Sequence, residues 1–466
     1  MDRCLYLAQL SDIVQRLNGI FLDAGLVTTR AFLPEQKLAD GKLIVRIIVG
    51  RISGFQSETL TPRQLDWAVP AQPGDLLNLR DIEQGLDQLN RLQSNQATIQ
   101  MLPGALPGES VVRIESVRSS RYGARLSLTG NDIADGDDYR GRVDLRADDL
   151  AGINDSLSLN FNQALAESDT AASYGYGFDY ALPYGYSTFS LSGSRFEYDN
   201  TANGAVRTFE VSGDSTTLSA NANHTLFRNR SFKIDASFSL SSKESENFIE
   251  DSRIDVSSRK LTVARAALDT KQFIGTDITA FYSVAAERGL EWLGADKDEH
   301  SAFSDRAQFR KYAASARVSK PKWQWVWSLG TQAQYSPDLL PTSEQIIVAS
   351  SGLLTGFSNV SLAGSRGVWA RIDTSSPWWA LGTPKLQSSL RFSLLKGWVP
   401  HTSDQAQGYG SASAIGVSAS LASPLASALS LQMSVGKVVD RPSRRSGVQE
   451  DQSDSPDAAI TLSYTL

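Results

Sequence analysis

The stretch Trp323–Gln332, WQWVWSLGTQ, indicates a β-strand with two unlike faces, because apolar and polar residues alternate in it with a period of two. One face carries Trp323, Trp325, Trp327 and Leu329, and the other carries Gln324, Ser328, Gly330 and Gln332. Three tryptophans on one face of a strand would make a large apolar patch on a soluble protein. In a membrane β-barrel, the same residues suit the lipid face and the aromatic girdle at the membrane interface.

The same alternation recurs from Arg121 to the C-terminus. It is clear at Val143–Ala147, Leu157–Phe161, Phe232–Leu240, Ile278–Val284 and Val417–Leu421, where the polar faces carry Ser, Asn and Gln more than Lys and Glu. A membrane barrel needs alternating segments of about ten residues. Because an open sheet would leave unpaired backbone groups in lipid, the sheet must close. The final residues, Ile460, Leu462, Tyr464 and Leu466, predict the closing strand. A large soluble β-sandwich or solenoid is the alternative, and solubility without detergent would favour it.

Bulk composition excludes several function classes. The chain has 466 residues, a net charge of −6 and a pI near 5.3, which argues against a nucleic-acid partner. Cys4 is its single cysteine, and its three histidines, His224, His300 and His401, are far apart in sequence. Common hydrolase, nucleotide-binding and metal-site motifs do not occur, so we predict no catalytic residue, no metal and no cofactor. No apolar run approaches the ~20 residues of a membrane helix, and Met1 leads directly into an amphipathic pattern, so no signal peptide is expected.

The first 120 residues have a different pattern, in which a helix precedes two strands, twice over. Helical spacing of apolar residues predicts a first helix through Leu10–Phe21, with strands at Val27–Leu33 and Lys42–Val49. The second module begins with a strand at Arg51–Phe55 and a Pro/Gly-rich link ending at Gly74. A helix capped by Asn78 follows, with the apolar stripe Ile82, Leu86, Leu89 and Leu92. Strands are then expected at Ala97–Leu102 and Ser110–Val117. Two generic α+β domains are the alternative interpretation.

The residues of these modules are more specific than their pattern. Gly25–Arg30 (GLVTTR), Leu33–Gln36 (LPEQ), Val49–Ile52 (VGRI), Leu77–Leu86 (LNLRDIEQGL), Leu89–Leu92 (LNRL) and Leu102–Gly108 (LPGALPG) resemble the two POTRA domains of two-partner secretion transporters. These transporters are the haemolysin and filamentous-adhesin exporters of the Omp85 superfamily. The resemblance continues at Tyr180–Leu191, Arg288–Ala295 and Leu339–Gln345. The first module departs from the family because it opens on its helix without the usual first strand. The family's signal peptide, plug helix and linker are also not seen, so we expect a start codon placed too late or a fragment.

The resemblance implies an all-β transmembrane barrel of about 16 antiparallel strands behind two small α+β POTRA domains. The expected bounds are 1–51 for the first POTRA domain, 52–118 for the second and 119–466 for the barrel. The barrel would contain a lumen loop near 346–367, within Leu340–Gly367, a stretch that lacks strand alternation. This loop carries no charge from Ile346 through Ala363, which is unusual for a long loop in water. We therefore expect it to fold back into the lumen.

In the family, an Arg at the loop tip pairs with an Asp on the barrel wall. The tip here reads Leu354, Thr355, Gly356 and Phe357, with Thr355 in the place of the Arg. Leu395, two residues before Gly397 and expected to point inward, takes the place of the Asp, and the loop exit is altered to Gly364, Ser365, Arg366 and Gly367. Loss of both charges avoids leaving one unpaired, which costs roughly 3–5 kcal/mol when buried. We predict a loop held by packing and weaker hydrogen bonds, looser or differently gated.

The function implied is export through the outer membrane, with the POTRA domains in the periplasm. The partners would be a large secreted β-helical exoprotein, captured on exposed POTRA strand edges, and outer-membrane lipid; the transporter is expected to be a monomer that binds no nucleic acid. Side-chain pockets for the client are predicted near Ile82, Leu86 and Leu89. The alternatives are an Omp85-type insertase, a diverged paralogue with impaired secretion, and a passive porin or adhesive barrel.

Overall fold

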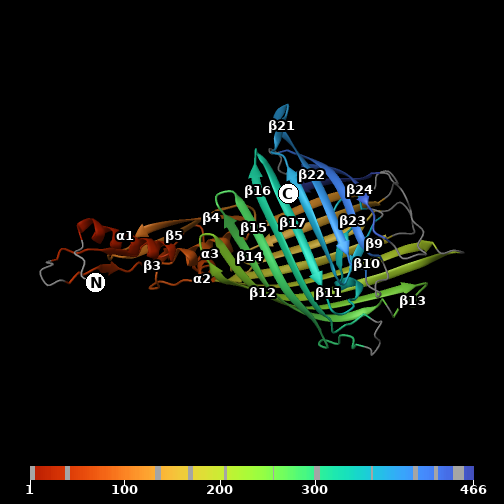
Figure 1. Cartoon of the computed structure of the whole chain (residues 1–466), viewed down its shortest axis with the longest axis horizontal. Coiled ribbons are helices and arrows are strands. Elements are labelled where there is room, and N and C mark those ends of the chain that lie inside the picture. Colours follow the sequence, from red (N-terminus) through yellow and green to blue (C-terminus); the bar gives the residue numbers. More distant parts are fainter. Residues whose placement is uncertain are drawn as a thin grey trace.

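The structure, a computed structural model, consists of two small modules at one end of the molecule and a large barrel at the other (Figure 1). It describes residues 6–36, 42–131, 138–165, 172–203, 207–255, 257–298, 305–357, 360–401, 408–423, 429–443 and 456–466. Cys4 and His300, discussed above, lie outside the described residues. Within the part described, no helix is long and apolar enough to cross a membrane.

The first module contains α1 (Leu7–Asp23) and a two-stranded sheet of β1 (Arg30–Phe32) and β2 (Arg46–Ile48). Both strands are shorter than the predicted Val27–Leu33 and Lys42–Val49. The cause is visible at Ile44, whose backbone N–H donates to Gln36 Oε1 at 2.8 Å and whose carbonyl accepts from Gln36 Nε2 at 2.9 Å. Because a side chain already satisfies these backbone groups, pairing begins only at Arg46.

The second module contains β3 (Arg51–Gln56), α2 (Pro62–Ala68), α3 (Leu79–Asn90), β4 (Asn95–Pro103) and β5 (Glu109–Arg118), with sheet order β3-β5-β4. The helix α2 was missed by the sequence analysis, which assigned this region to a link. Its signal was present, since Thr61 and Gln64 form a capping box around Pro62 at the first turn. The helices cover one face of the sheet, and the core between them includes Ile52, Leu77, Val112 and Ile114.

Sixteen long antiparallel strands and two short ones, β13 (Ser252–Arg253) and β21 (Trp379–Leu381), form the closed barrel. The prediction of a closed sheet is confirmed, because the final strand pairs with β6 through partners such as Leu462 and Leu128. The long strands are β6 (Tyr122–Asn131), β7 (Asp138–Asp148), β8 (Ser156–Ala164), β9 (Ala172–Tyr184), β10 (Ser187–Asn203), β11 (Thr208–Arg228), β12 (Phe232–Ile249), β14 (Arg259–Ile274), β15 (Ile278–Leu290), β16 (Arg310–Lys322), β17 (Trp325–Tyr335), β20 (Gly367–Ser375), β22 (Thr383–Val399), β23 (Gly410–Ala422), β24 (Leu429–Asp440) and β25 (Asp457–Thr465).

The outer face of the barrel is apolar, and the stretch Trp323–Gln332 contributes to it. Trp327 and Leu329 are exposed on this face, and Trp325 stacks at its edge against Phe392 of β22. Trp323 was wrongly placed on the same face. It lies in the turn before β17, where Trp323 and Gln324 have φ angles of 54° and 68°, so the strand alternation begins only at Trp325.

Candidate functional site

The stretch Leu340–Gly367 forms a hairpin inside the barrel. It contains the 3₁₀ turn η2 (Thr342–Glu344) and the paired strands β18 (Ile346–Ala349) and β19 (Leu362–Gly364). Val348, Leu354 and Phe357 pack against inward-facing residues of the wall, among them Leu395 and Ala414. Leu395 is fully buried in this cluster, which places its side chain on the inner face as expected. Apolar burial therefore holds the uncharged part of the loop.

Three glycines on neighbouring strands, Gly397 of β22, Gly416 of β23 and Gly436 of β24, let the loop lie directly on the wall. A Cβ at Gly397 of β22 would meet the carbonyl oxygen of Val348 at 2.2 Å, and a Cβ at Gly436 of β24 would meet that of Thr355 at 1.6 Å. These distances are far below van der Waals contact. Gly356, at the tip, has a φ of +118°, a conformation that L side chains rarely adopt. The wall thus has a glycine track shaped to the loop.

The tip is bound differently from the family arrangement. Thr355 and Ser434 of β24 share a hydrogen bond, with 3.1 Å between their hydroxyl oxygens, whereas Leu395 lies on β22 with β23 between. The charge near the tip comes from the wall. Arg371 of β20 donates to the carbonyl of Leu353 and forms a 2.8 Å ion pair with Asp373. The predicted packing and weak hydrogen bonds are therefore joined by the guanidinium of Arg371, which the sequence pattern did not indicate.

The two ends of the loop are fastened to each other. The backbone N–H of Leu340 donates to Ser365 Oγ at 2.9 Å, and Arg366 Nε donates to the carbonyl of Ser336 at 2.7 Å. Gly364 ends β19 and Gly367 begins β20, so the altered exit sequence forms the return into the wall. Neither Ser365 nor Arg366 takes part in an ion pair among the described residues.

The predicted client pocket near Ile82, Leu86 and Leu89 needs correction. Ile82 and Leu89 are fully buried and Leu86 is partly buried, all in the core of the second module. The apolar stripe of α3 faces its own sheet, as amphipathic helices usually do. These side chains therefore stabilise the module and offer no open groove.

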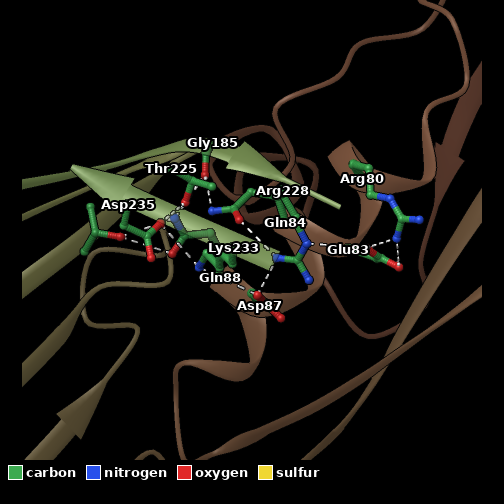
Figure 2. Close-up of polar contacts among 11 residues, drawn as sticks. Arg80, Glu83, Gln84, Asp87, Gln88, Gly185, Thr225, Arg228, Lys233 and Asp235 are labelled. Atoms are coloured by element: carbon green, nitrogen blue, oxygen red, sulfur yellow. Dashed lines mark hydrogen bonds and ion pairs between the residues drawn. The ribbon is translucent and has the colours of Figure 1, made fainter. Parts of the chain in front are cut away.

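The polar face of α3 contacts the rim of the barrel instead (Figure 2). Arg228, at the end of β11, donates to Glu83 Oε2 at 3.3 Å, to Gln84 Oε1 at 3.2 Å and to Asp87 Oδ2 at 2.5 Å. Gln88 Nε2 donates to the carbonyl of Gly185 at 3.0 Å, in the β9–β10 turn. These contacts join residues about a hundred or more positions apart, so the sequence alone gave no sign of them.

A second set of contacts continues the same interface. Asn154 Nδ2 donates to the carbonyl of Gln64 at 2.8 Å, and Trp67 meets Tyr184 edge-on with 5.6 Å between ring centroids. Burial raises the pKa of Asp81, against the opposing effect of its hydrogen bond from the Tyr186 hydroxyl. Burial and the carboxylate of Asp81 likewise raise the pKa of Tyr186. The second module is therefore docked on the barrel through charged, polar and aromatic contacts.

A cavity of about 690 Å³ lies between the docked module and the inner wall of the barrel. It is lined by Asp87 of α3, by the charged residues Lys233, Asp235, Asp269, Lys271, Arg317, Arg371, Asp373 and Arg391, and by polar residues such as Ser315 and Gln332. Both signs of charge are present, which suits a chain of mixed composition better than one small ligand. The described residues hold no group of three His, Cys, Asp or Glu side chains placed to bind a metal ion.

Comparison with known proteins identifies the architecture. A family described as haemolysin secretion/activation protein ShlB/FhaC/HecB matches residues 108–422. The chain belongs to this family. Residues 1–50 match a ShlB-type POTRA domain and residues 51–103 a further POTRA domain. The resemblance stated from the sequence, and with it a barrel of 16 strands behind two POTRA domains, is confirmed.

Relatives with curated descriptions are transporters. The outer membrane transporter CdiB of Dickeya dadantii is 32% identical over 391 residues, which cover 82% of this chain and 68% of that protein. The hemolysin transporter protein HpmB of Proteus mirabilis is 27% identical over 389 residues, covering 81% and 68%. The solved structure of CdiB from Escherichia coli has a TM-score of 0.91 at 24% identity, covering 100% of this chain and 86% of that one, and so shares its fold. The chain is a two-partner secretion transporter of the outer membrane, with its POTRA domains in the periplasm.

Proposed function

We propose that this transporter exports a large β-helical exoprotein, which its POTRA domains capture in the periplasm and pass into the barrel lumen. Residues 1–51 and 52–118 would form the two POTRA domains, and 119–466 the barrel, working as a monomer in outer-membrane lipid. The observation that carries the proposal is the lumen cavity, because Asp87 of the second POTRA domain and inward residues of the barrel line the same space. A client leaving that domain would meet a polar conduit capped by the loop.

Capture would use the outer edge of β4, which among the described strands pairs with β5 alone. Ala97 directs its backbone N–H and carbonyl to the side chain of Asn90, away from β5. By strand alternation, Ile99 and Met101 also present their main-chain groups on that edge, where an extended client could add a strand. Met101→Pro removes one edge N–H, and Met101→Ala is the matched control for loss of the side chain. We expect the proline variant alone to weaken client binding; equal binding by both variants would argue against capture on β4.

Export itself is tested by co-expressing the chain with the exoprotein encoded in the adjacent reading frame. Immunoblots of the medium should show the exoprotein only when the transporter is present. If the exoprotein stays in the periplasm while assembly of other outer-membrane barrels depends on the transporter, the chain is an insertase. If neither activity depends on it, the chain is a paralogue with impaired secretion.

In this proposal the loop is the gate. The tip residues Leu354, Thr355 and Phe357 rest on the wall, so passage of a client requires them to leave the glycine track. Leu395 and Gly397 form part of the surface that they leave, and Gly364 and Gly367 form the hinge where the loop returns to the barrel.

A further inference from the structure

A buried carboxylate lies at the base of the lumen loop. Glu344, in the turn η2, has a side chain only 1% exposed. Its Oε1 lies 2.5 Å from Nζ of Lys243, and its Oε2 lies 2.6 Å from Nζ of Lys311. Lys311 is also 2.8 Å from Glu287. We refer to Lys243, Glu287, Lys311 and Glu344 as the base cluster.

The base cluster joins the loop to a part of the wall that its tip does not touch. Lys243 lies on β12, Glu287 on β15 and Lys311 on β16. The tip rests on β22 to β24, on the other side of the strands β17 and β20 from which the loop arises. The loop is therefore held at two separate places, by apolar packing and hydrogen bonds at the tip and by ion pairs at the base.

We propose that Glu344 is a positioning residue for export, which holds the base of the loop against the wall and keeps the lumen closed between transport events. The proposal rests on the proposed function, since it concerns the gate of the same channel. Glu287 also pairs with Arg265 at 3.4 Å, so three cations surround the two carboxylates, and Glu344 is the member almost wholly removed from water. Releasing the loop requires Glu344 to leave both lysines.

The ion pair between Lys311 and Glu287 on the barrel wall does not depend on Glu344. Lys311 keeps its ion pair with Glu287, so Glu344→Gln frees the loop while leaving the strands β15 and β16 joined as before. Lys243 loses the carboxylate that it contacts and can turn toward water in the lumen, since its side chain is 32% exposed. Loosening should therefore be directed at the loop and spare the barrel.

The test is current recording of purified full-length protein in planar lipid bilayers, with no client present. We expect Glu344→Gln to raise the time-averaged open probability at least tenfold over the unmodified protein. Glu291→Gln is the matched control, because Glu291 is an exposed glutamate just beyond β15 and outside the base cluster. Equal open probabilities for all three proteins would overturn the proposal. Heat-modifiable migration in gels shows whether Glu344→Gln folds. If it does not fold, Lys243→Gln removes the ion pair between Lys243 and Glu344 and should also raise the open probability.

A tether separates loop release from general distortion of the barrel. A disulfide between Thr355→Cys and Ser434→Cys, made in a Cys4→Ser background, would fix the tip where those two side chains already meet. We expect the oxidised tether to suppress the extra openings of Glu344→Gln and a reductant to restore them. Extra openings that persist under the tether would refute loop positioning. The current recordings need no client. Failure of the unmodified chain to export would therefore refute the proposed function but would not change the conclusion about Glu344 and the loop.

Discussion

Removing Arg228 should loosen the second POTRA domain from the barrel. Its guanidinium is 15% exposed and contacts Glu83, Gln84 and Asp87 on α3 (Figure 2). A hydrogen bond to a charged group contributes about 1.5–3 kcal/mol. Asp87 is half exposed, so its share is reduced by solvent, and Glu83 keeps Arg80 as a partner at 2.9 Å. We therefore expect Arg228→Ala to cost about 1.5–3 kcal/mol in all, which lowers the docking constant roughly 10- to 150-fold.

The assay is a spin-label distance measurement across the interface. Spin labels are placed at Gln100 of β4 and Thr276 in the β14–β15 turn, because both residues are exposed and neither side chain forms a hydrogen bond or ion pair among the described residues. The unmodified protein should give one narrow distance distribution, and Arg228→Ala a broad one with longer distances. Arg230→Ala is the control, since Arg230 is exposed in the turn two residues later. A distribution for Arg228→Ala that matches the control would refute this account of docking.

Three further outcomes are expected. Gly436→Ala should displace the loop tip and lower the free energy of unfolding by about 1–3 kcal/mol, because the new Cβ would overlap the carbonyl of Thr355. Cross-linking of cysteines at positions 355 and 434 reports the displacement. Gly330→Ala is the control, since Gly330 has room for a Cβ and its substitution should not displace the tip. Leu395→Asp should lower thermal stability, and adding Thr355→Arg should not rescue it, because Thr355 is bound at β24 and Leu395 lies on β22, two strands away; a coupling free energy above about 1 kcal/mol would contradict this. Docking of the second POTRA domain should strengthen as pH falls from 7.5 towards the ordinary Asp pKa of 3.8. The reason is that the raised pKa of Asp81 means that the docked form binds a proton more tightly than the undocked form. The spin-label distances measure docking at each pH, and Asp81→Asn should remove its pH dependence.

Local patterning predicted the barrel well because lipid and lumen impose opposite demands on alternate residues. The segment Phe232–Leu240 lies in β12, and Ile460–Tyr464 lies in the closing strand β25. Errors arose where a local contact overrides the pattern. The turn at Trp323 has positive φ angles, and the side chain of Gln36 hydrogen-bonds the backbone of Ile44. Strands β17 and β2 therefore begin later in the chain than predicted.

The site was predicted less completely, because its key contacts depend on barrel closure and domain docking. The apolar loop and the inward direction of Leu395 follow from local sequence, but the contacts of Arg228, Glu344 and Arg371 join distant strands or domains. A weaker signal existed at Lys243 and Lys311, which are charged residues on strand faces that point into the lumen. Charges on inward faces indicate partners across the lumen but do not identify them.

Cross-linking a client in transit shows whether the exoprotein passes through the barrel lumen. A photoreactive amino acid at Gln332 would face the lumen cavity, whereas one at Leu329, on the same strand, would face lipid. During co-expression with the adjacent exoprotein, we expect a covalent adduct of transporter and exoprotein from position 332 and none from position 329. Secretion of the exoprotein with no adduct at position 332, or with equal adducts at both positions, would contradict export through this lumen.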